Sequence, residues 1–177
     1  SEFAAMSRVG PPEVANAHIT SHRSGWRNQL ENLGISDPAL SAATDEISRQ
    51  VTLVLHDVRG RWILEPQTDA VNAAEFAGVD GIDFVRATID RTFVDSAGSR
   101  WIIEFVVSRP DAGSATDAFI AAQRARRVAR LRRCKRLLAN FAPQPVCVAL
   151  YFTALPAFVT LDTDLDFSTD DAENRTP

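Results

Sequence analysis

The strand pair expected over residues 84–95 and 100–108 constrains the fold of this chain more than any other feature. The turn from Asp95 to Gly98 that joins the two strands has the composition of a tight reversal. Asp90 lies in the first strand and Glu104 in the second. A hairpin with this spacing can place the two carboxylates side by side at one end of a sheet.

Two neighbouring carboxylates suit the metal site of a nuclease, in which they hold one or two Mg²⁺ ions beside the scissile phosphate. A lysine two residues after Glu104 would share its face of the strand, because side chains alternate with a period of two. The chain has Val106 at that position. The alternative interpretation is structural: Asp90 pairs with Arg91 or caps a strand end, and Glu104 is an ordinary surface residue.

The other patterns in the chain predict helices packed around a central sheet. An Ala-rich segment over 69–78 is ambiguous between helix and strand, and its place before the hairpin favours a strand. The order of elements is typical of an α/β domain with helices flanking a mixed sheet. The expected elements are helices over 14–33 and 38–56, a turn at 59–61, a strand over 69–78, a turn at 78–81, the strand pair, a helix to Phe141, a buried strand over 144–153 and an edge strand over 157–161.

Local signals predict where the helices begin and end. Pro11 and Pro12 cannot propagate a helix, so ordered structure is expected from about Val14. Gly34 is placed to end the first helix, and Asp37 to cap the second, with Pro38 at its first position. Residues 114–117 resemble a capping box for the long helix that follows.

Basic residues are concentrated in that long helix. Residues 119–141 carry eight Arg and Lys side chains and no acid, so this stretch has a charge of +8 while the rest of the chain has −12. A basic stripe on an acidic protein indicates a localised contact with a polyanion. The alternative is a solvated helix face without a partner. The outward-facing candidates are Arg126, Arg132, Arg133 and Arg136.

Composition narrows the functional class. The chain lacks an apolar run of about 18 residues and a leader pattern, so we expect a cytoplasmic protein with no membrane partner. Cys134 and Cys147 form no cluster that would bind zinc, and no P-loop is present. Residues 1–13 are interpreted as an expression scar and a disordered lead, 14–161 as one domain, and 162–177 as an acidic tail.

Residues 87–108 resemble the central motif of RecB-like nuclease domains, in which G-x-I-D-R, a turn and W-I-V-D-Y-K-T-S follow one another. The resemblance extends to residues 26–35 and 57–64 and to the strand 145–152, which is similar to the family's R-P-V-R-L-A-L-Y-F. These domains belong to the PD-(D/E)xK superfamily and often lie at the C-terminus of AddA-like or UvrD-like helicase-nucleases. The resemblance implies a restriction-endonuclease-like core.

The resemblance also implies roles for individual residues. Asp90 matches the first metal-binding acid and Glu104 replaces the second, whereas Val106 stands where the family has its catalytic lysine. His22 is the counterpart of the family's metal-ligand histidine, although its spacing to Trp26 is shorter than usual. The implied cofactor is Mg²⁺ or Mn²⁺ if the domain is active, and none otherwise.

A second departure lies in the basic helix. The family's Y-x-x-Q-L-x-x-Y run is replaced by Arg127, Arg130, Leu131 and Cys134. Loss of a lysine from a buried acidic cluster would leave like charges uncompensated. We therefore expect Arg127 or Arg130 to form a salt bridge with Asp90 or Glu104 and to occupy the space of the metal.

Together these patterns predict a catalytically degenerate nuclease-fold domain of a DNA-repair and recombination helicase-nuclease. Such a domain would bind DNA, through Arg126, Arg130, Arg132, Arg133 and Arg136, or pack on a helicase motor domain or subunit. The alternative is an active Mg²⁺-dependent DNA exonuclease in which another basic residue has taken the place of the lysine.

Overall fold

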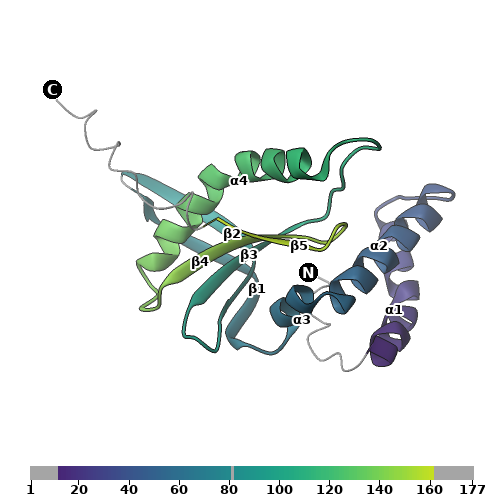
Figure 1. Cartoon of the computed structure of the whole chain (residues 1–177), viewed down its shortest axis with the longest axis horizontal. Helices are drawn as coiled ribbons and strands as arrows, with labels where there is room; N and C mark the ends of the chain where they lie inside the picture. The colour runs from purple at the N-terminus through teal and green to yellow at the C-terminus, as the bar shows by residue number, and fades with distance from the viewer. Residues whose placement is uncertain (1–11, 81, 162–177) are drawn as a thin grey trace.

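A five-stranded mixed sheet forms the centre of the protein (Figure 1), whose computed structural model describes residues 12–80 and 82–161. The strands lie in the order β1-β2-β3-β4-β5, and only β3 and β4 are parallel. The predicted α/β architecture, a mixed sheet flanked by helices, is confirmed. The elements are α1 (Pro12–Asn32), α2 (Ala39–His56), α3 (Val58–Leu64), β1 (Thr68–Asp80), β2 (Asp83–Val94), β3 (Arg100–Val106), α4 (Thr116–Ala139), β4 (Val146–Phe152) and β5 (Ala157–Thr160).

The predicted hairpin is present as β2 and β3, and Asp95 organises its turn. Its backbone N–H donates to the carbonyl of Ser99 (2.9 Å), and Gly98 has a φ of +82°, a value that favours glycine. Oδ2 of Asp95 accepts a hydrogen bond from Nε1 of Trp101 (2.7 Å). Burial raises the pKa of Asp95, but the hydrogen bonds from Trp101 and from backbone amides outweigh it and lower the pKa overall.

The two faces of the sheet carry separate cores, and β3 contributes to both because its side chains alternate between the faces. Ile103 packs with Val54, Ile63 and Tyr151 on the face covered by α2 and α3. On the opposite face, which α4 covers, the core is built from buried side chains of β3, α4 and β4: Ile102, Val106, Leu131, Cys134, Val148 and Phe152. The even-numbered side chains of β3 therefore point toward the basic helix.

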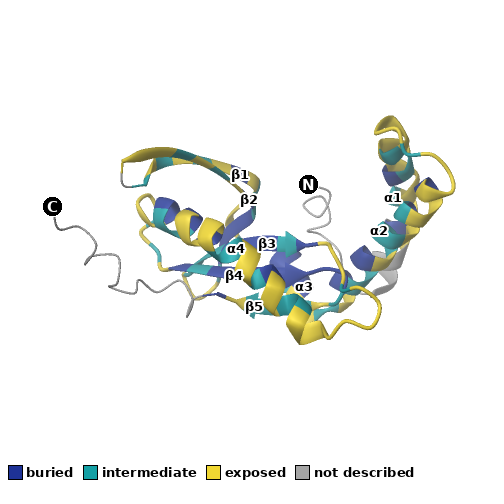
Figure 2. Cartoon of the chain, turned by 90° about the horizontal axis from the view of Figure 1, so that it is seen from above, coloured by how far each residue is buried: buried dark blue, intermediate teal, exposed yellow. Residues whose placement is uncertain are grey.

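Strands β1 and β2 extend beyond β3 as a long two-stranded arm that runs beside α4 (Figure 2). A β carbon on Gly78 of the arm would lie 3.1 Å from Leu137 of α4, so the arm and the helix are in close contact. The strand predicted over 69–78 is confirmed, but the turn predicted at 78–81 is wrong at its start, since β1 continues to Asp80. Glycine at position 78 favours a turn, but here Gly78 packs against Leu137 of α4 and remains within β1.

The predicted turn at residues 59–61 is wrong, because α3 spans these residues. Oδ2 of Asp57 caps this helix by accepting the N–H of Gly60 (2.7 Å) and also accepts the hydroxyl of Tyr151 (3.0 Å). Glycine is required within the helix because a β carbon on Gly60 would lie 2.2 Å from the carbonyl oxygen of Val54. Close packing, not a turn, explains this glycine.

Several helix ends also differ from the prediction. Helix α1 begins at Pro12, where a missing N–H costs nothing in the first turn. Asp37 does not cap α2; its carboxylate accepts hydrogen bonds from Ser41 and Arg27, and Pro38 occupies the cap position. The capping box predicted at 114–117 is absent, since the cap of α4 is Ala115 without a side-chain hydrogen bond. The Gly34 stop is confirmed by its φ of +84°.

Residues 1–11 and 162–177, on which the predictions of a terminal lead and an acidic tail fall, lie outside the described residues. Within the described part of the chain, none of the helices combines the length and the apolar character that crossing a bilayer requires.

Candidate functional site

Asp90 and Glu104 come together where β2 separates from β3. The ladder between these strands runs from Val94 with Arg100 to Arg91 with Ile103, and continuing it by one pair would set Asp90 opposite Glu104. There Oδ2 of Asp90 accepts the backbone N–H of Phe105 (2.9 Å). The carboxylate thus satisfies a β3 donor that lies just beyond the last pair of the ladder.

Near Asp90, the side chains of β2 also change the face of the sheet toward which they point. Phe93 belongs to the core beneath α2 and α3, whereas Ile89, four residues earlier, belongs to the core beneath α4. Across β1 the pairs Asn72 with Arg91 and Ala74 with Ile89 flank Ala73, whose φ is +49°. Rotation of β2 at Asp90 allows the arm to leave the sheet and run beside α4.

Both oxygens of Glu104 are bound by arginines from α4. Nε of Arg127 lies 3.0 Å from Oε1, and Nη2 of Arg130 contacts Oε2. Arg130 also donates from Nη1 to the carbonyl of Thr88 in β2 (3.0 Å), and Nη1 of Arg127 donates to Oε1 of Gln123. The expected salt bridge between an arginine of the basic helix and this acidic pair is therefore confirmed, with Glu104 as the partner of both arginines.

The electrostatics of Glu104 reflect competing effects. Only 9% of the residue is exposed, and this burial raises the pKa of its carboxyl, as does the charge of Asp90. Arg130 and Arg127 pull the pKa in the opposite direction. Removing one partner from a fully buried pair typically costs about 3–5 kcal/mol, because the other charge is left uncompensated. The cost is smaller for Arg130, whose side chain is 48% exposed and therefore screened by solvent.

Val106 shares the face of Glu104, as the strand period predicted. Its side chain is fully buried in the core beneath α4, beside Leu131 and Cys134. A lysine at this position would have to extend out of an apolar cluster, so valine fits its surroundings here.

The structural alternative for the acidic pair holds only in part. Asp90 does accept a backbone N–H at the end of the β2–β3 ladder. Arg91, however, does not pair with it: the guanidinium of Arg91 donates to Oδ1 of Asn72 (2.7 Å) and to the carbonyl of Glu65 (3.1 Å). Glu104 is buried and is not a surface residue. Asp90 and Glu104 therefore belong to an ordered network of hydrogen bonds and ion pairs between the hairpin and α4.

The residues present do not fit the metal that the resemblance implies. Within residues 12–80 and 82–161, no three His, Cys, Asp or Glu side chains converge in a way that could hold a metal ion. His22, the expected third ligand, lies on α1, where its ring is 6.4 Å from that of Trp26, and it does not join Asp90 and Glu104 in a ligand group. Glu104 is already occupied by two guanidinium groups.

A polar cleft of about 780 Å³ opens beside Glu104, between the end of β3 and the first half of α4. It combines three guanidinium groups with two serine hydroxyls, a donor set that suits a phosphate or another oxyanion. The nearby acids are Glu104, whose oxygens are bound, and Asp111. Its polar lining residues are Glu104, Ser108, Arg109, Asp111, Ser114, Gln123, Arg126 and Arg127.

The basic stripe is only partly available to a ligand. Arg136 binds Asp80 of the arm with two contacts (2.9 and 2.6 Å), and Arg133 lies 3.3 Å from the same carboxylate. Hydrogen bonds from Arg136 are the largest influence on the pKa of Asp80, which is lowered. Of the five arginines predicted to bind DNA, Arg130, Arg133 and Arg136 thus contact carboxylates of this chain. All five except the half-buried Arg136 are exposed.

Three residues that line the polar cleft or bind the arginines of α4 were not predicted from the sequence. Gln123 is buried and lies one helical turn before Arg127, so its spacing of four residues was the available signal. Asp80 gave no signal, because its partners lie more than fifty residues away. Arg109 follows the end of β3 and lines the cleft, but the sequence offered no pattern that singled it out.

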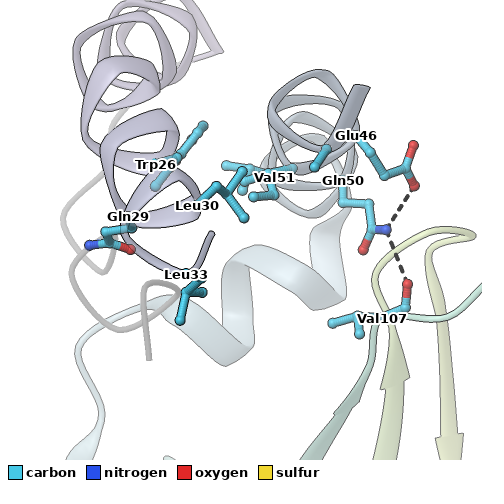
Figure 3. A pocket seen from close by; sticks show the side chains of 10 residues that line it. Trp26, Gln29, Leu30, Leu33, Glu46, Gln50, Val51 and Val107 are labelled. Atoms are coloured by element: carbon cyan, nitrogen blue, oxygen red, sulfur yellow. Dashed lines mark hydrogen bonds between the residues drawn. The ribbon is translucent and has the colours of Figure 1, made fainter. Parts of the chain in front are cut away.

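A second cavity, of about 510 Å³, is apolar and lies between α1, α2 and the end of β3 (Figure 3). Trp26, Leu30 and Val51 line it, and Gln50 at its rim donates to Oε1 of Glu46 (2.8 Å) and to the carbonyl of Val107 (3.1 Å). This hydrogen-bonded rim fixes α2 to the end of the sheet.

Neither a protein-family model nor a curated protein sequence matches this chain.

Proposed function

We propose that this chain is a catalytically degenerate nuclease-fold domain, with a restriction-endonuclease-like core, that binds DNA through its phosphates. The observation that carries the proposal is the state of Glu104, both of whose oxygens are held by Arg127 and Arg130. A divalent cation at this carboxylate would lie beside two guanidinium groups, whose positive charge opposes its binding. The hairpin contains the two neighbouring acids, but Glu104 is engaged by arginines and no third metal ligand joins the pair among the described residues.

The cleft beside Glu104 is the proposed phosphate-binding site. Arg109 and Arg126 line it and are exposed, and guanidinium groups form paired hydrogen bonds with phosphate oxygens. Such contacts carry no base specificity, so we expect sequence-independent binding that weakens steeply with salt.

Packing on a helicase motor domain or subunit is the other use of such a fold. It is favoured by exposed apolar side chains near the tip of the arm, of which Ile82 is 94% exposed, with Val79 and Phe84 close to it in sequence. This use would leave DNA affinity independent of the cleft arginines.

An active Mg²⁺-dependent exonuclease is the competing enzymatic function. It is favoured by the proximity of Asp90 to Glu104, and it would require both arginines to release Glu104. The described residues, in contrast, offer no group of three ligands for the metal.

Fluorescence anisotropy of labelled DNA at about 50 mM and about 200 mM salt tests the binding proposal. Replacing Arg109 and Arg126 with alanine should weaken binding, and it should reduce the slope of log K against log salt by about 1 for each phosphate that is no longer neutralised. Arg23→Ala is the matched control, because Arg23 has the same charge but lies on α1, paired with Asp45. No binding at low salt, or an equal weakening in the control, would contradict the proposal.

A further inference from the structure

The arm of β1 and β2 has one face packed on α4 and one face that is exposed, and exposed residues alternate along both strands (Figure 2). Phe76, Ala87 and Ile89 pack in the core beneath α4. Because successive side chains of a strand point to opposite faces, the residues between them point away from the helix. This outer face consists of three cross-strand pairs, all of whose residues are exposed: Glu75 with Thr88, Ala77 with Arg86, and Val79 with Phe84.

The outer face carries an apolar pair near the tip of the arm. Val79 and Phe84 lie opposite each other in the ladder, and they are 60% and 68% exposed. Exposed apolar side chains that lie next to one another are typical of an interaction surface. A partner that covers this pair would remove its apolar area from water.

Two opposite charges lie beside the apolar pair. Glu75 on β1 and Arg86 on β2 belong to neighbouring cross-strand pairs of the outer face. Neither side chain forms an ion pair with another residue in the described part of the chain. Because the acid lies on one strand and the arginine on the other, a two-fold rotation brings each of them toward its opposite charge.

A two-fold axis parallel to the strands makes the outer face complementary to itself. This rotation sets β1 of one copy over β2 of the other and keeps each cross-strand pair level with its counterpart. Val79 of one copy then lies over Phe84 of the other. Arg86 lies over the strand that carries Glu75 of the other copy, offset by one pair, about 7 Å along the strand, which a long side chain can span. An axis across the strands would set Glu75 over Val79 and would lose both contacts.

We propose that two copies of this chain associate through the outer faces of their arms. The two arms then lie between the two basic helices, in the layer order α4, arm, arm, α4. The contact is small, and specific interfaces below about 1,200 Å² are weak. We therefore expect a dissociation constant on the order of 10–100 µM, so that the chain is monomeric in dilute unfolding measurements. This association does not depend on DNA binding.

Sedimentation velocity of the chain from about 1 µM to about 500 µM tests the association, because this range spans the expected dissociation constant. The weight-average mass should rise from that of a monomer toward that of a dimer. A chain that stays monomeric throughout would overturn the proposal, and Val79 and Phe84 would then remain candidates for packing on another protein.

Reversal of single charges tests which faces meet. A homodimer of Glu75→Arg, or of Arg86→Glu, would contain two like-charged contacts, and we expect its dissociation constant to rise at least about tenfold. An equimolar mixture of the two variants should dimerise again, because each contact then joins an acid to an arginine. Recovery in the mixture also shows that both variants fold. Asp117→Arg is the matched control: it makes the same change in charge on an exposed position of α4, outside the arm, and should leave the association unchanged.

Replacement of the aromatic side chain tests the apolar contact. Phe84→Thr keeps a residue that favours strands but removes most of the apolar area, and it should weaken the association at least about tenfold. Dimers that persist in both charge reversals, a mixture that stays monomeric, or an association unaffected by Phe84→Thr would each overturn the proposed interface.

Discussion

At the scale of single residues, Gly60 shows that close packing can require a glycine inside a helix. A β carbon there would lie 2.2 Å from the carbonyl oxygen of Val54 and 2.6 Å from the hydroxyl of Tyr151. The first neighbour is backbone and the second is held by Asp57, so neither can move cheaply.

Gly60→Ala should therefore lower the free energy of unfolding by about 3 kcal/mol or more, although alanine is the better helix former. Gly25→Ala is the matched control. Gly25 lies within α1 and has nothing within 4 Å of its β-carbon position, so the change should stabilise by about 0.5–1 kcal/mol. Denaturant unfolding measures both, and a similar effect of the two changes would contradict this explanation of Gly60.

Some contacts of single residues could be predicted from the sequence, and others could not. The strand period placed Val106 on the face of Glu104, and charge compensation predicted an arginine on the acidic pair; both are confirmed. The ion pair of Asp80 with Arg136 joins residues far apart in sequence, and no local pattern specifies it. Long-range pairs of this kind depend on how the arm is placed.

At the scale of elements, α2 is attached to the sheet through Glu46 and Gln50. Gln50 bridges Glu46 and the carbonyl of Val107, and it also accepts a hydrogen bond from Thr153 at the end of β4. Arg49 is the largest influence on the pKa of Glu46, which falls from 4.5 to about 2, with Gln50 and Arg109 acting in the same direction.

This lowered pKa predicts a pH-dependent contribution to stability. The folded state keeps Glu46 ionised to lower pH than the unfolded state does, so its contribution is present above pH 4.5 and is lost as the pH falls toward 2. Glu46→Gln should lower the free energy of unfolding by about 1 kcal/mol at neutral pH, since the group is partly exposed, and by less at about pH 3. Glu75→Gln, on an exposed position of β1, is the control for the loss of one surface carboxylate. A Glu46→Gln effect that is constant with pH would rule out this contribution.

Helices, strands and turns were predicted correctly where neighbouring residues determine the backbone conformation. The prediction failed where contacts with distant residues determine it. The Asp95 turn and the Gly34 stop were predicted from backbone preferences and are present. Helix α3 was missed because glycine at position 60 was interpreted as a turn signal, whereas it marks close approach to Val54.

At the scale of the whole molecule, the sheet carries two cores, and the acidic pair lies on the side of α4. The arm of β1 and β2 leaves the sheet at Asp90 and reaches the C-terminal half of α4, where Asp80 meets Arg133 and Arg136. Helix α4 thus links the hairpin acids, the arm and the polar cleft. Sequence predicted its charge, but not that four of its arginines would be bound to acids of the fold.

Incubating the full chain with labelled single- and double-stranded DNA in Mg²⁺ or Mn²⁺, and measuring both binding and cleavage, tests the proposed function most directly. Because Arg127 and Arg130 hold both oxygens of Glu104, we predict salt-sensitive binding and no cleavage with either metal. Metal-dependent cleavage that Asp90→Ala abolishes would contradict the proposal, since it would show that the paired carboxylates still hold a catalytic metal.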